Sequence, residues 1–198
     1  IRAGRRTAGE LDFLVRQRPT GRLLHWEVTA KFYIGRRRED GSVRFHGPNT
    51  ADRLDLERRH LIEHQLTRPY RTPGRETLAA RGLRVDASWL IAKGRLFYPL
   101  DGRAAVTEPE GAHPAHLRGW WGTPAAFRAM AAERPLRWRL VYKPDWLAEL
   151  DAEDGAPPRA LADFLPLLEP VAARQTIMVA GFDDDGAERS RGFVVAPV

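Results

Sequence analysis

The chain has 198 residues, 43% of them hydrophobic, and a net charge of +6, which suits one substantial domain and would leave two domains cramped. The absence of cysteine excludes disulfides, thiolate metal sites and cysteine nucleophiles, and it fits a reducing compartment, so we expect a cytoplasmic protein. No run of 18 apolar residues occurs, so we expect no membrane-spanning helix and no membrane partner.

Alternating and helical apolar patterns predict the strands and helices in chain order. The expected strands cover residues 10–17, 23–34, 43–45, 89–98, 138–143, 175–182 and 191–195. The expected helices cover residues 51–66, 75–81, 124–133 and 159–168, and the last one ends before Pro170. Together these elements indicate an α/β fold with a central mixed β-sheet flanked by helices, in a single domain of residues 1–198.

The first two strands form a hairpin around a turn at residues 18–22, which contains Pro and Gly. Side chains alternate between the two faces of a strand. The polar face of the second strand carries His25, Glu27, Thr29, Lys31 and Tyr33. The opposite, apolar face carries Leu24, Trp26, Val28, Ala30 and Phe32. Symmetric pairing about the turn places Asp12 opposite a residue near position 28, within reach of Glu27.

Two neighbouring carboxylates repel each other unless a cation lies between them. Mg²⁺ (or Mn²⁺) suits this position, because Mg²⁺ takes oxygen ligands and commonly uses one or two carboxylates together with substrate phosphate. Asp12 and Glu27 are therefore the candidate metal ligands, and Lys31 is a candidate for orienting the attacking water and offsetting charge on the phosphorane. The alternative is an amphipathic hairpin whose polar face carries ordinary surface charge.

Two segments, Gly9-Glu-Leu-Asp-Phe-Leu-Val15 and His25-Trp-Glu-Val-Thr-Ala-Lys-Phe-Tyr33, resemble the core of the PD-(D/E)XK nuclease superfamily. The chain also resembles a bacterial family, domain of unknown function eighteen-fifty-three, which is grouped with that superfamily. The segments that carry this resemblance are Gly47-Pro-Asn49, Asp52-Arg-Leu-Asp55, His64-Gln-Leu66, Lys93-Gly-Arg-Leu-Phe-Tyr-Pro99 and His116-Leu-Arg-Gly-Trp-Trp121. The resemblance implies a restriction-endonuclease-like core. It also implies a nuclease site made by Asp12, Glu27, Lys31 and Gln65.

The position of the lysine departs from the superfamily pattern. That pattern is Glu-x-Lys, with about 6.7 Å between the Cα atoms on one face, whereas four residues, about 13 Å in a regular strand, separate Glu27 from Lys31. Thr29 stands where the lysine is expected. A β-bulge would shorten the path; otherwise the lysine comes from elsewhere or catalysis is lost. The acidic helix that usually opens this fold is expected before Ile1.

The positive charge favours a polyanionic partner, because each phosphate that a cation neutralises releases counterions. The candidate phosphate contacts are Arg36, Arg37 and Arg38 beside the hairpin and Arg118 beside Trp120 and Trp121. The alternatives are a solvated arginine loop, tryptophans that belong to the core, and an arginine content that reflects only a GC-rich genome. We predict a Mg²⁺-dependent nuclease acting on DNA or RNA; the alternative is a catalytically inactive nuclease-like domain that binds nucleic acid or protein.

Overall fold

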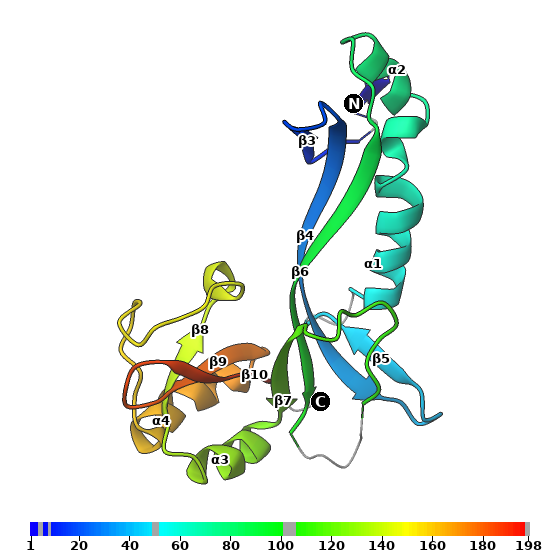
Figure 1. The fold of residues 1–198 in the computed structure, drawn as a ribbon. Coiled ribbons are helices and arrows are strands. Elements are labelled where there is room, and N and C mark those ends of the chain that lie inside the picture. Colours follow the sequence, from blue (N-terminus) through cyan, green and yellow to red (C-terminus); the bar gives the residue numbers. More distant parts are fainter. Residues whose placement is uncertain (4–5, 8, 49–51, 101–105, 197–198) are drawn as a thin grey trace. The chain divides into compact units, whose positions relative to one another are not determined.

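The computed structural model describes residues 1–3, 6–7, 9–48, 52–100 and 106–196 and has an α/β architecture (Figure 1). Its strands are β1 (Arg2–Ala3), β2 (Arg6–Thr7), β3 (Phe13–Arg16), β4 (Leu23–Arg37), β5 (Val43–His46), β6 (Ala87–Pro99), β7 (Leu117–Gly122), β8 (Arg137–Val141), β9 (Ile177–Phe182) and β10 (Glu188–Val194). Its α-helices are α1 (Leu54–His60), α2 (Gly74–Ala79), α3 (Pro124–Ala132) and α4 (Leu161–Ala172). Three short segments complete the set: the π-helical η1 (Leu61–Gln65) and the 3₁₀ turns η2 (Arg68–Tyr70) and η3 (Lys143–Asp145).

One mixed sheet of eight strands has the order β3-β4-β6-β7-β10-β9-β8, and β5 pairs with β4 outside this path. Both β3 and β5 are antiparallel to β4, while β7 is parallel to β6 and to β10. β9 is antiparallel to β8 and to β10. The expected α/β fold with a mixed sheet is thereby confirmed. Within the described ranges, no helix combines the length and the apolar character that a bilayer crossing requires.

Residue contacts divide the chain into two compact units. Unit 1 contains Ile1–Lys31 and Leu54–Lys93, and unit 2 contains Phe32–Arg53 and Gly94–Val198. Strands β4 and β6 each contribute residues to both units, so the division falls within strands and not at a linker. The single-domain organisation of residues 1–198 stays a prediction.

In unit 1, α1 and η1 run alongside β4 and β6 (Figure 1). Together they replace the single helix predicted for residues 51–66, of which residue 51 lies outside the described residues. Leu23 packs with Leu78 of α2 and with Val85 in a small apolar cluster. The carboxylate of Asp86 accepts the backbone N–H of Leu23 at 2.7 Å, which fixes the start of β6 against β4.

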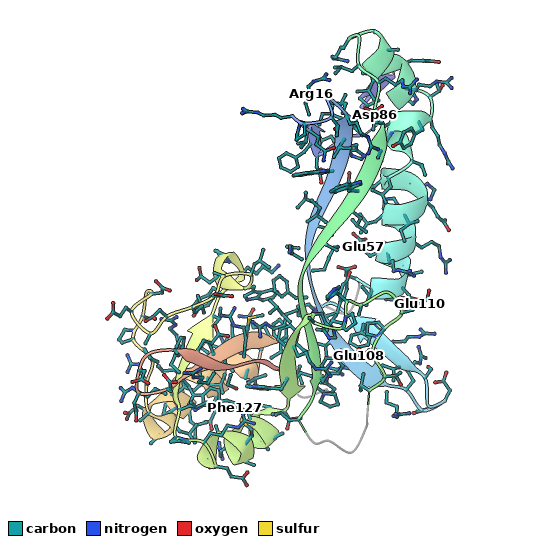
Figure 2. The ribbon with its side chains drawn as sticks, in the orientation of Figure 1. Arg16, Glu57, Asp86, Glu108, Glu110 and Phe127 are labelled. Carbon is teal, nitrogen blue, oxygen red and sulfur yellow. The ribbon has the colours of Figure 1, made fainter. Side chains whose placement is uncertain are left out.

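Unit 2 is built around β9, whose six residues are all buried. Alternation places Val179 in a cluster with Phe127 of α3 (Figure 2) and Phe164 of α4. On the other side of the strand, Met178 joins a second cluster with Phe193. Both faces of β9 are therefore covered, which explains why its sequence is a continuous apolar run.

The length of α4 contradicts the prediction that this helix ends before Pro170. Pro166 and Pro170 both lie exposed inside the helix, and each removes one backbone hydrogen-bond donor. The prolines lie on the exposed side of the helix, and the opposite side buries Phe164 and Leu168. Burial of these two side chains outweighs the lost hydrogen bonds, so the helix continues to Ala172.

Strand β7 was not predicted, because neither its composition nor its alternation marks a strand. Trp120 stacks on Phe127, with 5.6 Å between the ring centroids, and the indole N–H of Trp121 donates to the carbonyl of Gly35 at 2.9 Å. Both tryptophans are thus anchored in the interior of unit 2 on opposite faces of β7. Only this tertiary packing identifies the segment as a central strand.

Candidate functional site

The hairpin of β3 and β4 positions the two candidate metal-binding carboxylates. Its register pairs Leu14 with His25. Two residues further along each strand, the same register places Asp12 opposite Glu27, one residue from the predicted pairing. Asp12 lies just before β3, and its Oδ2 accepts the backbone N–H of Val28 at 2.9 Å. The register of β3 and β4 lies within one residue of the predicted one, and a shared role of the two carboxylates stays a prediction.

The polar face of β4 in unit 1 is the covered face. His25 is fully buried and Glu27 is 6% exposed, whereas Val28 on the other face is 40% exposed. Alternation assigns residues to the two faces of the strand, but it does not determine which face is covered. The polar face is covered because α1 lies on that side and directs Glu57 towards the strand (Figure 2). An ordinary amphipathic hairpin with its polar face in water would show the reverse burial.

His25 is held by polar contacts on both sides of its ring. Its Nδ1 lies 3.1 Å from Ser88 Oγ, and that hydroxyl donates to Tyr70 Oη at 3.2 Å. Nε2 lies 3.3 Å from Oε2 of Glu27. The sequence placed His25 on the polar face but gave it no role, since only the fold shows that Ser88 and Tyr70 orient it.

Burial favours the neutral forms of both members of this pair. Loss of water lowers the pKa of His25, although the nearby Asp12 raises it, and Arg68 lowers it. Loss of water raises the pKa of Glu27, Asp12 raises it further, and Arg68 opposes the shift. The His25–Glu27 contact is therefore not a charged salt bridge. A cation placed beside Glu27 would favour its ionised form.

Four polar atoms of unit 1 are buried without a hydrogen-bond partner among the described residues: His25 Nε2, Trp26 Nε1, Glu27 Oε2 and Gln65 Oε1. Gln65 is the last residue of η1. Buried polar atoms are nearly always paired in folded proteins, so such a group requires a reason. A site that binds a ligand through these atoms is one such reason.

Lys31 is placed against α1. Its Nζ lies 2.9 Å from Glu57 Oε1, and both side chains are a little under one-third exposed. Thr29, half-buried on the same face, lies between Lys31 and Glu27. The lysine therefore shares the covered face with the carboxylates, while its charge is balanced by the helix.

No group of three or more His, Asp or Glu side chains in the part of the chain that the structure describes could hold a metal ion alone. Asp12 and Glu27 could contribute one carboxylate each. An open groove of about 580 Å³ adjoins Asp12, and it is lined by Ile1, Glu10, Leu11, Asp12, Phe13 and Val28. The groove gives a ligand access to the Asp12 end of the hairpin.

The candidate arginines belong to unit 2, whereas Asp12 and Glu27 belong to unit 1. The guanidinium of Arg36 lies 4.8 Å from the centre of the Trp121 ring, and burial lowers the pKa of Arg36. Arg37 donates to the carbonyl of Gly41 at 2.9 Å, and Arg38 is exposed. Of these three, Arg38 is the most available to a phosphate.

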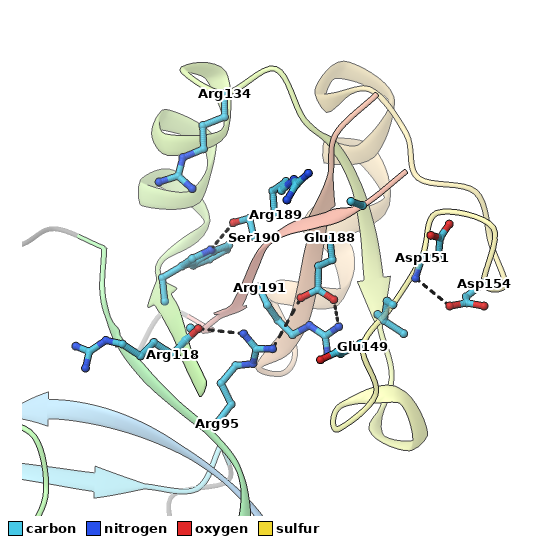
Figure 3. Close-up of a pocket in the computed structure, with 14 residues that line it drawn as sticks. Arg95, Arg118, Arg134, Glu149, Asp151, Asp154, Glu188, Arg189, Ser190 and Arg191 are labelled. Atoms are coloured by element: carbon cyan, nitrogen blue, oxygen red, sulfur yellow. Dashed lines mark hydrogen bonds and ion pairs between the residues drawn. The ribbon is translucent and has the colours of Figure 1, made fainter. Parts of the chain in front are cut away.

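Arg118 lies 3.9 Å from the centre of the Tyr98 ring and forms an ion pair with Glu108. It also lines an open hollow of about 690 Å³ in unit 2 (Figure 3). At the floor of the hollow, Glu188 lies between the guanidinium groups of Arg95 and Arg191. Arginines and carboxylates both line this hollow, so its charges largely compensate one another.

The unfolding free energy of Glu27→Gln minus that of wild type should increase from acid pH to neutral pH. A carboxyl whose pKa is raised by folding contributes stability below its unfolded pKa, and this contribution is lost as the pH rises through the folded pKa. Gln does not ionise, so Glu27→Gln escapes that loss. Urea unfolding in EDTA between pH 4.5 and pH 8 measures the difference between variant and wild type. A difference that stays constant over this range contradicts the assigned burial of an ionisable Glu27.

Comparison with known proteins gives one match. The model of a family described as Domain of unknown function (DUF1853) matches residues 1–195. No curated protein and no solved structure matches the chain significantly.

Proposed function

This chain belongs to the family Domain of unknown function (DUF1853), and from its hairpin site we propose that it is a metal-dependent phosphodiesterase acting on nucleic acid, with a restriction-endonuclease-like core. The observation that carries the proposal is Glu27. It is buried on the covered face of β4, one of its oxygens has no hydrogen-bond partner among the described residues, and the Asp12 carboxylate accepts the backbone N–H of the neighbouring Val28. A buried carboxylate beside a second carboxylate is costly unless a cation joins them.

The residues of the site fit Mg²⁺ or Mn²⁺. The available donors are carboxylate oxygens of Asp12 and Glu27, and Mg²⁺ commonly binds through one or two carboxylates with water and substrate phosphate as its other ligands. When bound, such an ion polarises the phosphoryl group and lowers the pKa of a coordinated water molecule.

The chain's own residues supply orientation and charge balance. The backbone N–H of Val28 fixes the Asp12 carboxylate, and His25, which contacts Ser88 through Nδ1, lies 3.3 Å from Glu27 Oε2 through Nε2. Gln65 Oε1, buried in the same unit, is proposed to support the site as an acceptor. Lys31 is proposed to offset negative charge on the covered face, where it is paired with Glu57.

The direct test is cleavage of labelled single- and double-stranded DNA and RNA by the purified chain in Mg²⁺ or Mn²⁺, with EDTA as the reference. Products should form with the metal ion and not with EDTA. The absence of products from every substrate in both metal ions contradicts the catalytic proposal.

A second function, nucleic-acid binding without cleavage, is favoured by the ion pair of Lys31 with Glu57, which engages the one lysine of the site. Salt-sensitive binding with no divalent-ion requirement and no products would support this second function.

Paired variants of Lys31 and Glu57 separate the two roles of the lysine. If Lys31 acts on the phosphate, Lys31→Met should lower cleavage at least tenfold while Glu57→Gln leaves it within about twofold. If the pair only joins α1 to β4, both variants should lower the unfolding free energy by less than about 1 kcal/mol, because partly exposed ion pairs contribute little. The two variants should then have the same cleavage rate. Cleavage rates and unfolding curves of both variants decide between these outcomes.

A further inference from the structure

The face of unit 1 opposite Glu27 is apolar and partly exposed, with Leu24 buried near the turn of the hairpin. We define the aromatic face by the side chains that alternate onto it from β3, β4 and β6: Phe13, Trp26, Val28, Trp89 and Ile91. Phe13 is 55% exposed and Trp89 is 50% exposed. Contiguous apolar patches that remain exposed commonly mark sites of interaction with a ligand or another macromolecule.

The aromatic rings on this face lie close to one another. Trp26 and Trp89 stack with 6.3 Å between their ring centroids and an interplanar angle of 14°. Phe13 pairs across the hairpin with Trp26. Three neighbouring strands thus each contribute one ring, at the spacing that β-sheet pairing imposes.

The charge on this face suits a polyanion. The described residues that alternate onto it within unit 1 are Phe13, Val15, Leu24, Trp26, Val28, Ala30, Ala87, Trp89, Ile91 and Lys93. Lys93, which is exposed, is the one charged residue in this set, and the set contains no carboxylate. A single-stranded nucleic acid with its bases stacked on the rings would therefore meet one cation and no carboxylate on the face itself, while the carboxylates of Glu10 and Asp12 line the adjoining groove.

The aromatic face is continuous with the candidate site. Phe13 and Val28 belong to the aromatic face and also line the groove at Asp12. A chain of nucleotides that crosses the face can therefore reach the Asp12 end of the hairpin through this groove.

We propose that the aromatic face binds single-stranded nucleic acid, with bases stacked on Trp89 and Phe13 and a phosphate at Lys93. This inference names the substrate class of the proposed phosphodiesterase and in that respect rests on the proposed function. Unstacked bases expose π-faces to aromatic side chains, whereas the bases of a duplex are enclosed between their neighbours, so the face selects single strands.

Binding is measured by fluorescence anisotropy of a labelled 12-nucleotide single strand and of the matching duplex, in EDTA so that no metal-dependent cleavage occurs. Trp89→Leu keeps an apolar side chain but removes the ring, and it should weaken single-strand binding about 5- to 100-fold. Trp89→Phe keeps a stacking surface and should stay within a few fold of wild type. Tyr142→Leu, which changes an exposed aromatic residue of unit 2, should leave the affinity unchanged.

Lys93→Met tests the phosphate contact separately. The slope of log affinity against log salt concentration should decrease by about 0.7 for one lost contact to a single strand. An unchanged slope removes Lys93 from the proposed surface.

Three results would overturn the proposal: equal affinity of wild type and Trp89→Leu for the single strand, preference for the duplex, or a wild-type dimer that Trp89→Leu converts to a monomer. The last result, from light scattering, would assign the face to a second copy of the chain. Because the binding assay contains no metal ion, its outcome is independent of catalysis. Binding that depends on Trp89, together with no Mg²⁺-dependent cleavage products, contradicts the phosphodiesterase proposal alone. Cleavage products without Trp89-dependent binding contradict the aromatic face alone.

Discussion

Replacing Glu27 with Gln should reduce Mg²⁺-dependent cleavage at least about 100-fold, which corresponds to a loss of about 2.7 kcal/mol of transition-state stabilisation. The reason is that Gln keeps the size of the side chain but supplies no negative charge to a metal ion at the buried end of the hairpin. Asp12→Asn should cause a loss of similar size. The measurement is the initial rate of cleavage at saturating Mg²⁺.

Two controls separate a catalytic loss from a structural one. Glu63 is an exposed carboxylate of η1 in the same unit, and Glu63→Gln should cleave at the wild-type rate. Mn²⁺ should raise the melting temperature of wild type more than that of Glu27→Gln, because only the wild type has both carboxylates. If either Asp12→Ala or Glu27→Gln cleaves at the wild-type rate, the metal site is assigned wrongly.

Replacing Arg191 with Met should lower the unfolding free energy of unit 2 by about 3–5 kcal/mol, the usual cost of breaking a buried ion pair from one side. Arg191 is 2% exposed. Its Nη1 donates to the carbonyls of Asp145, Trp146 and Ala148, and its Nη2 pairs with Glu188. The variant leaves those carbonyls and one carboxylate with fewer partners in a place with little water. In a chain of this length the melting temperature should fall by about 10 °C.

Arg189→Met is the matched control on the same strand. Arg189 is exposed and pairs with Asp183 at 2.5 Å, and exposed ion pairs contribute less than about 1 kcal/mol. Its melting temperature should change by no more than about 3 °C. Equal melting temperatures for Arg191→Met and Arg189→Met would show that the hydrogen bonds of Arg191 do not hold η3 and the following segment to β10.

The sequence by itself determined the hairpin. A turn with Pro and Gly at residues 18–22, flanked by alternating strands, fixes which residues pair, because register in a hairpin depends on the turn and on local alternation. Asp12 therefore came within one residue of its predicted partner. The α/β class followed in the same way from local periodicity, and the strand expected over residues 175–182 corresponds to β9.

Only the tertiary structure decided which face of the hairpin is buried. Alternation divides His25 and Glu27 from Trp26 and Val28, but it does not say on which side α1 packs. The helix lies on the polar side, so the carboxylate is buried and the rings are exposed. The same limit applies to α4, where Phe164 and Leu168 keep a helix intact past two prolines. Local patterns specify neighbours in the chain, whereas burial depends on elements that the chain brings back from far away.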